Sequence, residues 1–353
     1  MPDSWPVNVA GLEELAAARL EPTAYDYYRS GAGDEITLER NRAAYARIEL
    51  LPRVLRDVSE VSVETELLGE PAKPILVAPT AFHGLACERG EPATAEGAAA
   101  AGAIFCLSSL SNTPLERFAG LEGRRWFQLY VFKDRALTRE LLDRAEAAGF
   151  EAIVVTVDAP VLGRRERDVV NGFDLPPGLT IACVGDRLPA EPGESGLAAY
   201  FAAQLDPSLD WGDLEWLVGR SGLPVLVKGV HRPDDARRAL EAGASGVIVS
   251  NHGGRQLDTV PATIDMLPAI ADAVAGEADV LLDGGVRRGT DVLKALALGA
   301  RAVLVGRPIL WALALDEAGG VSRVLGMLEE ELRAAMALCG ASGVADLGPE
   351  LIA

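Results

Sequence analysis

The sequence has few cysteines, few histidines and no long apolar run. Its four cysteines, Cys87, Cys106, Cys183 and Cys339, are far apart and form no C-x-x-C pair. This spacing predicts buried thiols, with neither a metal site nor a disulfide framework. No run reaches the roughly 18 apolar residues of a membrane helix, and the N-terminus lacks a basic segment followed by an apolar one. We therefore expect a cytoplasmic protein.

Positive charge is also scarce. Lysine and arginine total 33 against 52 acidic residues, so the formal net charge is -19. Such a surface repels phosphate backbones and anionic lipid, which predicts neither nucleic acid nor a membrane as a partner. The composition, 49% hydrophobic and 24% charged with 37 glycines, is typical of a globular enzyme. An anionic substrate would need a local cationic pocket.

Short runs rich in Val, Ile and Leu alternate with longer stretches of helical periodicity. Their near-continuous apolarity indicates strands covered on both faces, and the helical stretches are long enough for parallel crossovers. Eight such units predict an α/β fold, a (β/α)8 TIM barrel. The eight runs occupy residues 74–80, 103–109, 125–131, 152–158, 224–230, 246–252, 279–285 and 302–308.

The barrel accounts for most of a single predicted domain over residues 1–353. We expect an N-terminal helical extension over 1–73, the barrel over 74–320 and C-terminal helices over 321–353. Proline and glycine gather in residues 175–195. This stretch predicts a mobile lid loop over the barrel mouth.

Each of the eight runs becomes polar at its C-terminal end, the face at which such barrels carry their active sites. A single polar residue there often only caps the next helix, but eight together favour a site. These residues are Thr80, Ser108, Gln128 with Tyr130, Thr156 with Asp158, Lys228, His252, Asp283 and Arg307.

The motif SNHGGRQLD, residues 250–258, follows the sixth run and pairs an imidazole with a guanidinium. The two glycines after His252 allow a tight turn that brings Arg255 to the same cavity. A base beside a carboxylate-binding fork is the combination that oxidation of a hydroxy acid requires.

The motifs DGGVRRGTD, residues 283–291, and LVGRP, residues 304–308, predict a phosphate site, since the last two loops of such barrels commonly bind phosphate. Glycines allow close backbone approach and arginines supply charge, while a helix beginning near Thr290 is expected to offer free N–H groups. The phosphate could belong to a substrate or a cofactor. No Walker lysine motif and no G-x-G-x-x-G after a first strand occur, which disfavours a nucleoside triphosphate or Rossmann-bound NAD.

The same motifs, with FQLYVFKDR, TVDAP followed by GRRERD, and the opening YDYYRSGAGDE, resemble the FMN-dependent L-2-hydroxyacid oxidase and dehydrogenase family. The resemblance extends from about residue 20 to residue 345 and is closest to glycolate oxidase and its relatives. It implies FMN as the cofactor and homo-oligomers of four or eight subunits. The residues that it places around the flavin and its phosphate are Ala78, Pro79, Thr80, Ala81, Ser108, Gln128, Thr156, Lys228, Ser250, Asp283, Gly284, Gly285, Arg287, Gly306 and Arg307.

The resemblance also implies a substrate pocket. Arg255, Tyr27 and Arg165 would bind the substrate carboxylate, and Tyr130 would bind its hydroxyl. His252 would be the base, and Asp158 would orient its ring. Lys228 would stabilise negative charge on the reduced flavin.

Two positions bear on the substrate and the electron acceptor. Ala81 matches oxidases of this family, where several dehydrogenases have glycine, which favours O2 as acceptor and hydrogen peroxide as product. Leu110 stands where glycolate oxidase has tryptophan, which predicts a substrate larger than glycolate, such as lactate or an aromatic hydroxy acid.

Three other functions are open from the sequence. One is a dehydrogenase that passes electrons to a quinone or a protein carrier. The others are a flavin barrel that isomerises a phosphorylated substrate and a barrel that only binds partners. The presence of both His252 and Arg255 argues against these last two.

Overall fold

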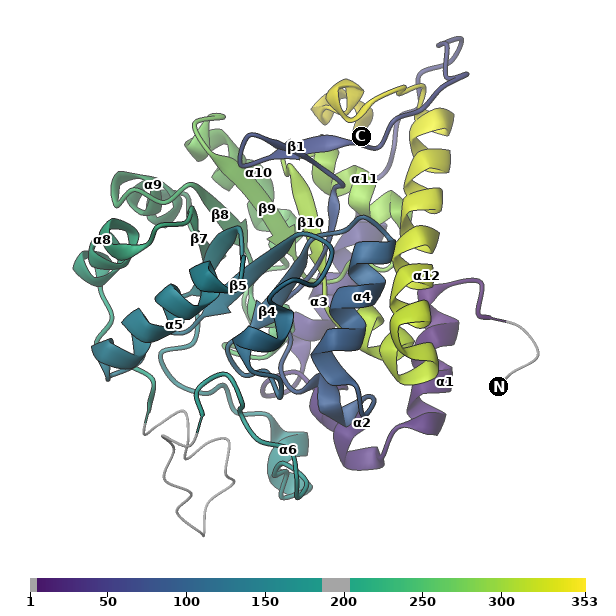
Figure 1. Cartoon of the computed structure of the whole chain (residues 1–353). Helices are drawn as coiled ribbons and strands as arrows, with labels where there is room; N and C mark the ends of the chain where they lie inside the picture. Colours follow the sequence, from purple (N-terminus) through teal and green to yellow (C-terminus); the bar gives the residue numbers. More distant parts are fainter. Residues whose placement is uncertain (1–4, 186–203) are drawn as a thin grey trace.

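A closed barrel of eight parallel strands forms the centre of the molecule in a computed structural model, which describes residues 5–185 and 204–353 (Figure 1). The strands follow one another around the barrel in chain order, and β10 pairs with β3 to close it. All eight predicted runs form these strands, so the predicted (β/α)8 fold is confirmed. The bounds are β3 Ile75–Val77, β4 Phe105–Ser108, β5 Arg125–Leu129, β6 Ala152–Thr156, β7 Val225–Val230, β8 Gly246–Val249, β9 Asp279–Asp283 and β10 Ala302–Val305.

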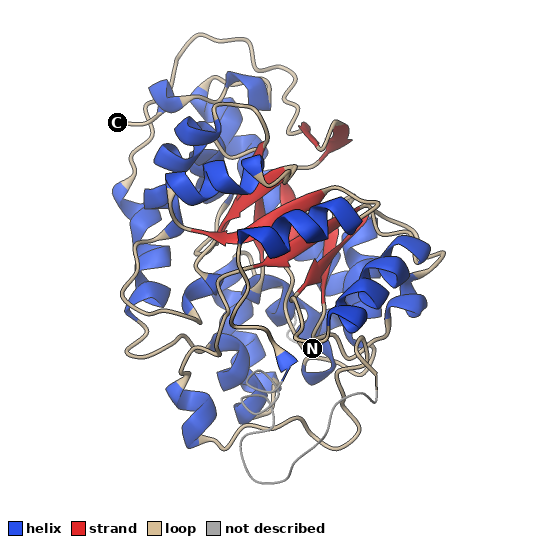
Figure 2. Ribbon diagram, turned by 90° about the vertical axis from the view of Figure 1, so that its left-hand side faces the viewer, coloured by secondary structure: helices blue, strands red, loops and turns tan. Residues whose placement is uncertain are grey.

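Helices surround the barrel on its outside, as Figure 2 shows. The longest helix, α12, follows β10 and packs against α4 and α1. Its backbone departs from helical geometry at Asp316 and Glu317, so two helical segments meet there at a kink. The bounds are α4 Gly90–Ala100, α5 Arg135–Ala147, α6 Glu166–Val170, α8 Trp211–Arg220, α9 Pro233–Glu241, α10 Thr263–Val274, α11 Gly289–Ala297 and α12 Arg307–Cys339.

The segment before the barrel contains three helices and a short antiparallel hairpin. The helices are α1 Val9–Arg19, α2 Pro22–Arg29 and α3 Ile36–Arg47, and the hairpin strands are β1 Thr65–Leu67 and β2 Glu70–Ala72. Leu67 is fully buried in the same apolar cluster as interior barrel residues such as Leu76 and Trp126. The hairpin therefore closes the end of the barrel at which the strands begin.

Strand alternation sorts the apolar residues into two cores. Leu76, Cys106 and Leu226 belong to the cluster inside the barrel, whereas their neighbours Val77 and Val227 belong to the cluster between strands and helices. Because successive strand residues face opposite sides, a strand buried on both sides reads as a continuous apolar run. This burial explains why the eight runs could be recognised without period-2 alternation in the sequence.

Half of the predicted lid loop can be located. Within residues 175–185, Ile181, Cys183 and Val184 are buried, and residues 186–195 lie outside the described part of the chain. No helix in residues 5–185 or 204–353 has the length and hydropathy to cross a bilayer. The same residues contain no group of three His, Cys, Asp or Glu side chains placed to hold a metal ion, and all four cysteines are free thiols.

Candidate active site

A polar layer ends the barrel interior where the strands finish. On every strand, the residue two positions after the last interior apolar residue faces the same interior, because strand side chains alternate. Seven members of this layer line one cavity, which we call the barrel-mouth cavity. Ser250 joins them through hydrogen bonds to Lys228 and Asp283. The layer consists of the polar residues Thr80, Ser108, Gln128, Thr156, Lys228, Ser250 and Asp283, together with Gly306, which has no side chain.

The structure brings the predicted site residues together. The barrel-mouth cavity is also lined by the residues that were predicted around the substrate, Tyr27, Tyr130, Arg165, His252 and Arg255. Asp158 and Ser250 are the two predicted residues that do not line it, and each is hydrogen-bonded to one that does. The other predicted residues at the cavity wall are Ala78, Pro79, Ala81, Gly284, Gly285, Arg287 and Arg307.

Lys228, Ser250 and Asp283 form a buried hydrogen-bonded group. Lys228 Nζ lies 2.9 Å from Asp283 Oδ2 and donates to Ser250 Oγ at 2.8 Å, and Ser250 Oγ donates to Asp283 Oδ2 at 2.9 Å. Burial lowers the pKa of Lys228, but Asp283 and Asp158 outweigh burial and raise that pKa above its ordinary value. Lys228 therefore remains a cation inside the cavity.

His252 and Asp158 form a partly buried, hydrogen-bonded pair. The Nδ1 atom of His252 lies 2.8 Å from Asp158 Oδ1, and its Nε2 atom lies 3.5 Å from the hydroxyl oxygen of Tyr130. Burial lowers the pKa of His252 although Asp158 opposes it. For Asp158, burial is outweighed by His252 and Lys228, which lower its pKa. The pair is thus a neutral imidazole whose Nδ1–H donates to a carboxylate, leaving Nε2 free to accept a proton.

A strained turn directs the His252 side chain toward the cavity. Residues 252–254 all have positive φ, with His252 at 57°. A Cβ atom on Gly254 would lie 2.7 Å from the backbone nitrogen of Leu38, so a larger residue would collide with α3. Asn251 stabilises the turn by accepting from Gly254 N and exchanging amide hydrogen bonds with Asn41. The glycines of the motif are therefore required by the turn.

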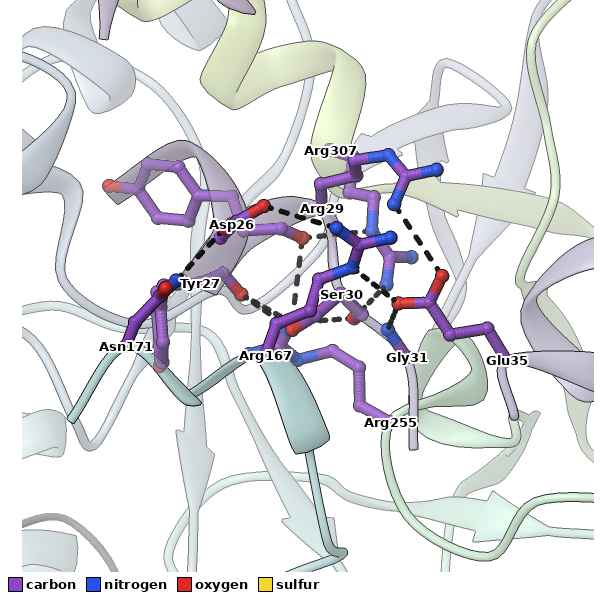
Figure 3. Close-up of polar contacts among 11 residues, drawn as sticks. Asp26, Tyr27, Arg29, Ser30, Gly31, Glu35, Arg167, Asn171, Arg255 and Arg307 are labelled. Carbon is purple, nitrogen blue, oxygen red and sulfur yellow. Dashed lines mark hydrogen bonds and ion pairs between the residues drawn. The ribbon is translucent and has the colours of Figure 1, made fainter. Parts of the chain in front are cut away.

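Two arginines give one side of the cavity its positive charge: Arg165 is buried and Arg255 is partly buried. The Arg255 guanidinium donates to the carbonyl oxygens of Tyr27 and Ser30 at 2.6 and 2.9 Å (Figure 3). It also lies over the Tyr27 ring, 4.9 Å from the centroid. Burial, reinforced by the neighbouring Arg165, lowers the pKa of Arg255 to about 10. Two cations held together away from water predict an anionic ligand between them.

A second pair of arginines, Arg287 and Arg307, follows the ends of β9 and β10, and both are partly buried. Burial lowers the pKa of Arg287 to about 10, and burial together with Arg255 and Arg287 lowers the pKa of Arg307 well below its ordinary value. Arg307 donates to the carbonyl oxygens of Tyr28, Gly253 and Ser30. A Cβ on Gly285 would overlap the backbone of Asn41, so only glycine fits at that turn. The arrangement suits a phosphate dianion.

One part of the predicted phosphate site is wrong. The N–H groups at the start of α11 are not free, because Arg287 N and Arg288 N donate to Asp291 Oδ2 and Gly289 N donates to Glu331 Oε2. The helix caps itself with its own aspartate and with a carboxylate from α12. A phosphate in this part of the cavity would therefore be bound by the guanidinium groups of Arg287 and Arg307 and not by the start of α11.

Two contributors to the cavity were not predicted from the sequence. The carbonyl oxygen of Ser30 accepts from both Arg255 and Arg307, and so links the two pairs of arginines at the cavity (Figure 3). Every residue has a backbone carbonyl group, so the sequence does not indicate which carbonyl groups bind a side chain. Tyr28 also lines the cavity, and its hydroxyl donates to Phe82 O at 2.6 Å. The repeated tyrosines of the YDYY segment were the available signal for Tyr28.

Comparison with known proteins agrees with this geometry. Residues 16–353 match the family described as FMN-dependent dehydrogenase. The chain belongs to the FMN-dependent dehydrogenase family. It is 54% identical to an L-lactate oxidase of Nostoc sp., covering 98% of this chain and 97% of that protein. It is 50% identical to glycolate oxidase 3 of Oryza sativa subsp. indica, covering 96% and 94%.

Solved structures of mandelate oxidase have the same fold. One of them, with (S)-4-hydroxymandelic acid, superimposes with a TM-score of 0.94 at 44% identity and covers 99% of this chain and 98% of that one. The fold and the family predicted from the sequence motifs are both confirmed.

The cofactor of this family member is FMN. The polar atoms of the barrel-mouth cavity suit the chemical groups of FMN. Three buried polar atoms of its lining residues have no hydrogen-bond partner among the described residues. Gln128 Nε2 is a donor, Asp283 Oδ1 an acceptor and Arg287 Nε a cationic donor. A flavin offers ring acceptors, ribityl hydroxyls and a phosphate, which are the complementary groups.

Proposed function

We propose that this flavoprotein oxidises an L-2-hydroxy acid to the 2-oxo acid and passes the electrons to O2, which gives hydrogen peroxide. The observation that carries the proposal is the placement of the His252 base beside Arg255, in the cavity whose floor suits FMN. Removal of two electrons and two protons from the substrate is balanced by reduction of O2 to hydrogen peroxide. Bound FMN supplies the two-electron acceptor between them.

Substrate binding is assigned to the cationic side of the cavity. Arg255 and Arg165 would bind the carboxylate, with Tyr27 as a further hydrogen-bond donor, and Tyr130 would hydrogen-bond the hydroxyl. Because Arg165 is buried and Arg255 is partly buried, their attraction for a carboxylate is stronger than it would be at the surface. This fixes the α-carbon in one orientation and selects one enantiomer.

Proton removal is assigned to His252. Its Nε2 atom would accept a proton from the substrate, and Asp158 would stabilise the resulting imidazolium and hold the ring in place. The same geometry serves proton removal from the hydroxyl oxygen or from the α-carbon. Lys228 would counter the negative charge that develops on the flavin side.

Flavin binding is assigned to the polar layer and the β9 and β10 loops. Around the ring we place Ala78, Pro79, Thr80, Ala81, Ser108, Gln128, Thr156, Lys228 and Ser250. Around the ribityl chain and phosphate we place Asp283, Gly284, Gly285, Arg287, Gly306 and Arg307. This assignment follows the family resemblance. It is supported by the cavity lining, which contains all of these residues except Ser250, and Ser250 is hydrogen-bonded to Lys228 and Asp283.

The side chain of the substrate is proposed from Leu110, which lines the cavity and is 4% exposed. A leucine leaves room that an indole would fill, so we propose lactate or a larger, including aromatic, L-2-hydroxy acid. The similarity to an L-lactate oxidase and to mandelate oxidase supports this range. A cytoplasmic location and a homo-oligomer of four or eight subunits remain predictions, which cell fractionation and light scattering would test.

A substrate panel tests the proposal directly. Purified protein would be mixed with glycolate, L-lactate, longer L-2-hydroxy acids, L-mandelate and the D-enantiomers in air, with hydrogen peroxide and 2-oxo acid measured. We expect equal amounts of peroxide and 2-oxo acid from an L-substrate larger than glycolate. Turnover only with an added quinone or protein carrier would instead make the protein a dehydrogenase, the alternative that the sequence left open.

A further inference from the structure

His83 is a fully buried histidine, placed behind the wall of the barrel-mouth cavity. Its Nε2 atom lies 2.6 Å from Thr80 Oγ1, and its Nδ1 atom lies 2.8 Å from Thr94 Oγ1 on α4. The ring has no exposed surface. His83 does not line the cavity, but Thr80 does. The imidazole thus connects a helix of the outer layer to a residue that we place at the flavin.

The ring is neutral. Burial lowers the pKa of His83, and the nearby Glu91 opposes this only in part. The Glu91 carboxylate is already used, because it accepts from His83 N, Asn112 N and Thr113 Oγ1. A neutral imidazole has one N–H donor and one acceptor nitrogen, so it forms one hydrogen bond of each kind with the two threonine hydroxyls.

Thr80 is held through its hydroxyl group. The hydroxyl is hydrogen-bonded to His83, and the methyl carbon of Thr80 lies beside Gly306. A threonine hydroxyl can otherwise rotate and choose among partners. Because the Thr80 hydroxyl is hydrogen-bonded to His83 Nε2, the histidine sets the direction of that hydroxyl. It also decides whether the hydroxyl offers a ligand its hydrogen or only an oxygen lone pair.

We propose that His83 is a positioning residue for the flavin, which acts by fixing the Thr80 hydroxyl at the wall of the barrel-mouth cavity. The inference rests on the proposed placement of FMN in that cavity. When Nε2 carries the ring proton, the Thr80 hydroxyl is free to donate to the flavin. When Nδ1 carries it, Thr80 must donate to His83 and can only accept from the flavin. His83 therefore influences flavin affinity and reduction potential without touching the flavin.

Two amide substitutions separate this role from a structural one. In His83→Gln the amide reaches the Nε2 position and keeps a partner for Thr80, whereas in His83→Asn it reaches only the Nδ1 position and keeps Thr94. We expect His83→Asn to weaken FMN binding by roughly three- to tenfold and to shift the flavin midpoint potential. His83→Gln should stay within about twofold of the unchanged protein, because the Thr80 contact is kept.

A double-mutant cycle tests whether the effect passes through Thr80. Thr80→Val alone should reproduce the loss, and His83→Asn should add nothing in the Thr80→Val background. Thr138→Val is the matched control, since Thr138 is a fully buried threonine that hydrogen-bonds Phe132 N and Asp134 O on α5. It should lower the thermal midpoint without changing FMN affinity or potential.

Three results would overturn the proposal: equal effects of the Asn and Gln variants, wild-type FMN affinity and potential in His83→Asn, or additive losses in the cycle. Failure of the unchanged protein to bind FMN would instead refute the proposed function. The two failures are therefore distinguishable in the same titration.

Discussion

The imidazole of His252 hydrogen-bonds the carboxylate of Asp158 at 2.8 Å, although 94 positions separate the two residues in the chain. Their strands, β6 and β8, both end at the barrel mouth with β7 between them. The side chain of Asp158 is 6% exposed, so its charge acts on the imidazole with little screening by water. This pair sets the pH dependence that we expect.

Asp158→Asn should reduce the turnover plateau and move the acid limb of the pH profile to lower pH. The pKa of His252 is already below 6.5 because of burial, and Asp158 is the group that raises it. Losing the carboxylate lowers this pKa further, so the neutral base persists to lower pH. The imidazolium formed during turnover loses its partner, and turnover should fall by at least about tenfold. Turnover over a pH series with one substrate measures both effects, and an acid limb that moves to higher pH would contradict the assignment.

Lys228→Met should slow anaerobic flavin reduction while the protein still folds. It removes the cation from the Lys228, Ser250 and Asp283 group and leaves Asp283 buried without its ion-pair partner. We therefore expect a lower thermal midpoint as well as slower reduction. Lys294→Met is the control, because Lys294 is a partly buried lysine on α11 that donates to Tyr45 O. Unchanged reduction in Lys228→Met would show that this lysine is only structural.

Arg287→Met should weaken binding of FMN but not of riboflavin. The substitution removes a guanidinium that we assign to the phosphate, at a cost of roughly ten- to a hundredfold in FMN affinity. The apoprotein should become more stable, because one of two neighbouring, partly buried cations is lost. Titration with both flavins and thermal unfolding measure these effects. Arg301→Ala, at an exposed arginine paired with Asp279, is the control and should leave flavin binding unchanged.

The barrel could be predicted from the sequence because each strand is buried on both faces. Such a strand appears within one short stretch of sequence, as an apolar run that ends in a polar residue. The polar layer follows from the same alternation, since each of its members stands two residues after an interior apolar residue. Thr156 and Lys228, for example, are direct neighbours in the register of β6 and β7.

The features that could not be predicted from the sequence depend on contacts between residues of different segments. The N–H group of Gly289 is taken by Glu331, 42 positions later, so the predicted free helix terminus is wrong. The hydrogen bonds that join Thr80, His83 and Thr94 give no composition or spacing signal. The catalytic and binding roles of the site residues, and the predicted domain bounds, remain predictions.

Leu110→Trp should narrow the substrate range toward glycolate. Leu110 lies at the cavity wall and is almost fully buried, so an indole at this position would occupy the space assigned to the substrate side chain. We expect kcat/KM for L-mandelate and longer 2-hydroxy acids to fall much more than for glycolate. Leu110→Met, which conserves volume, should leave the order of substrates unchanged. Equal losses for all substrates would indicate general damage to the site.

Arg255→Lys should raise the substrate concentration needed for half-maximal reduction and also slow reduction. An ammonium cannot reproduce the planar fork of a guanidinium, and it would lose the hydrogen bonds to Tyr27 O and Ser30 O. His252→Ala should mainly slow reduction, with less effect on the substrate concentration needed, because it removes the base but leaves the carboxylate-binding residues. Reduction rates measured across substrate concentration distinguish the two variants.

Anaerobic stopped-flow reduction of bound FMN tests the central claim most directly. The unchanged protein should lose its flavin absorbance on mixing with L-lactate or L-mandelate and keep it with the D-enantiomers. His252→Ala should still bind FMN, but its reduction should be slower by about a hundred- to ten-thousandfold. A His252→Ala rate within a few-fold of the unchanged protein would contradict the assignment of His252 as the base.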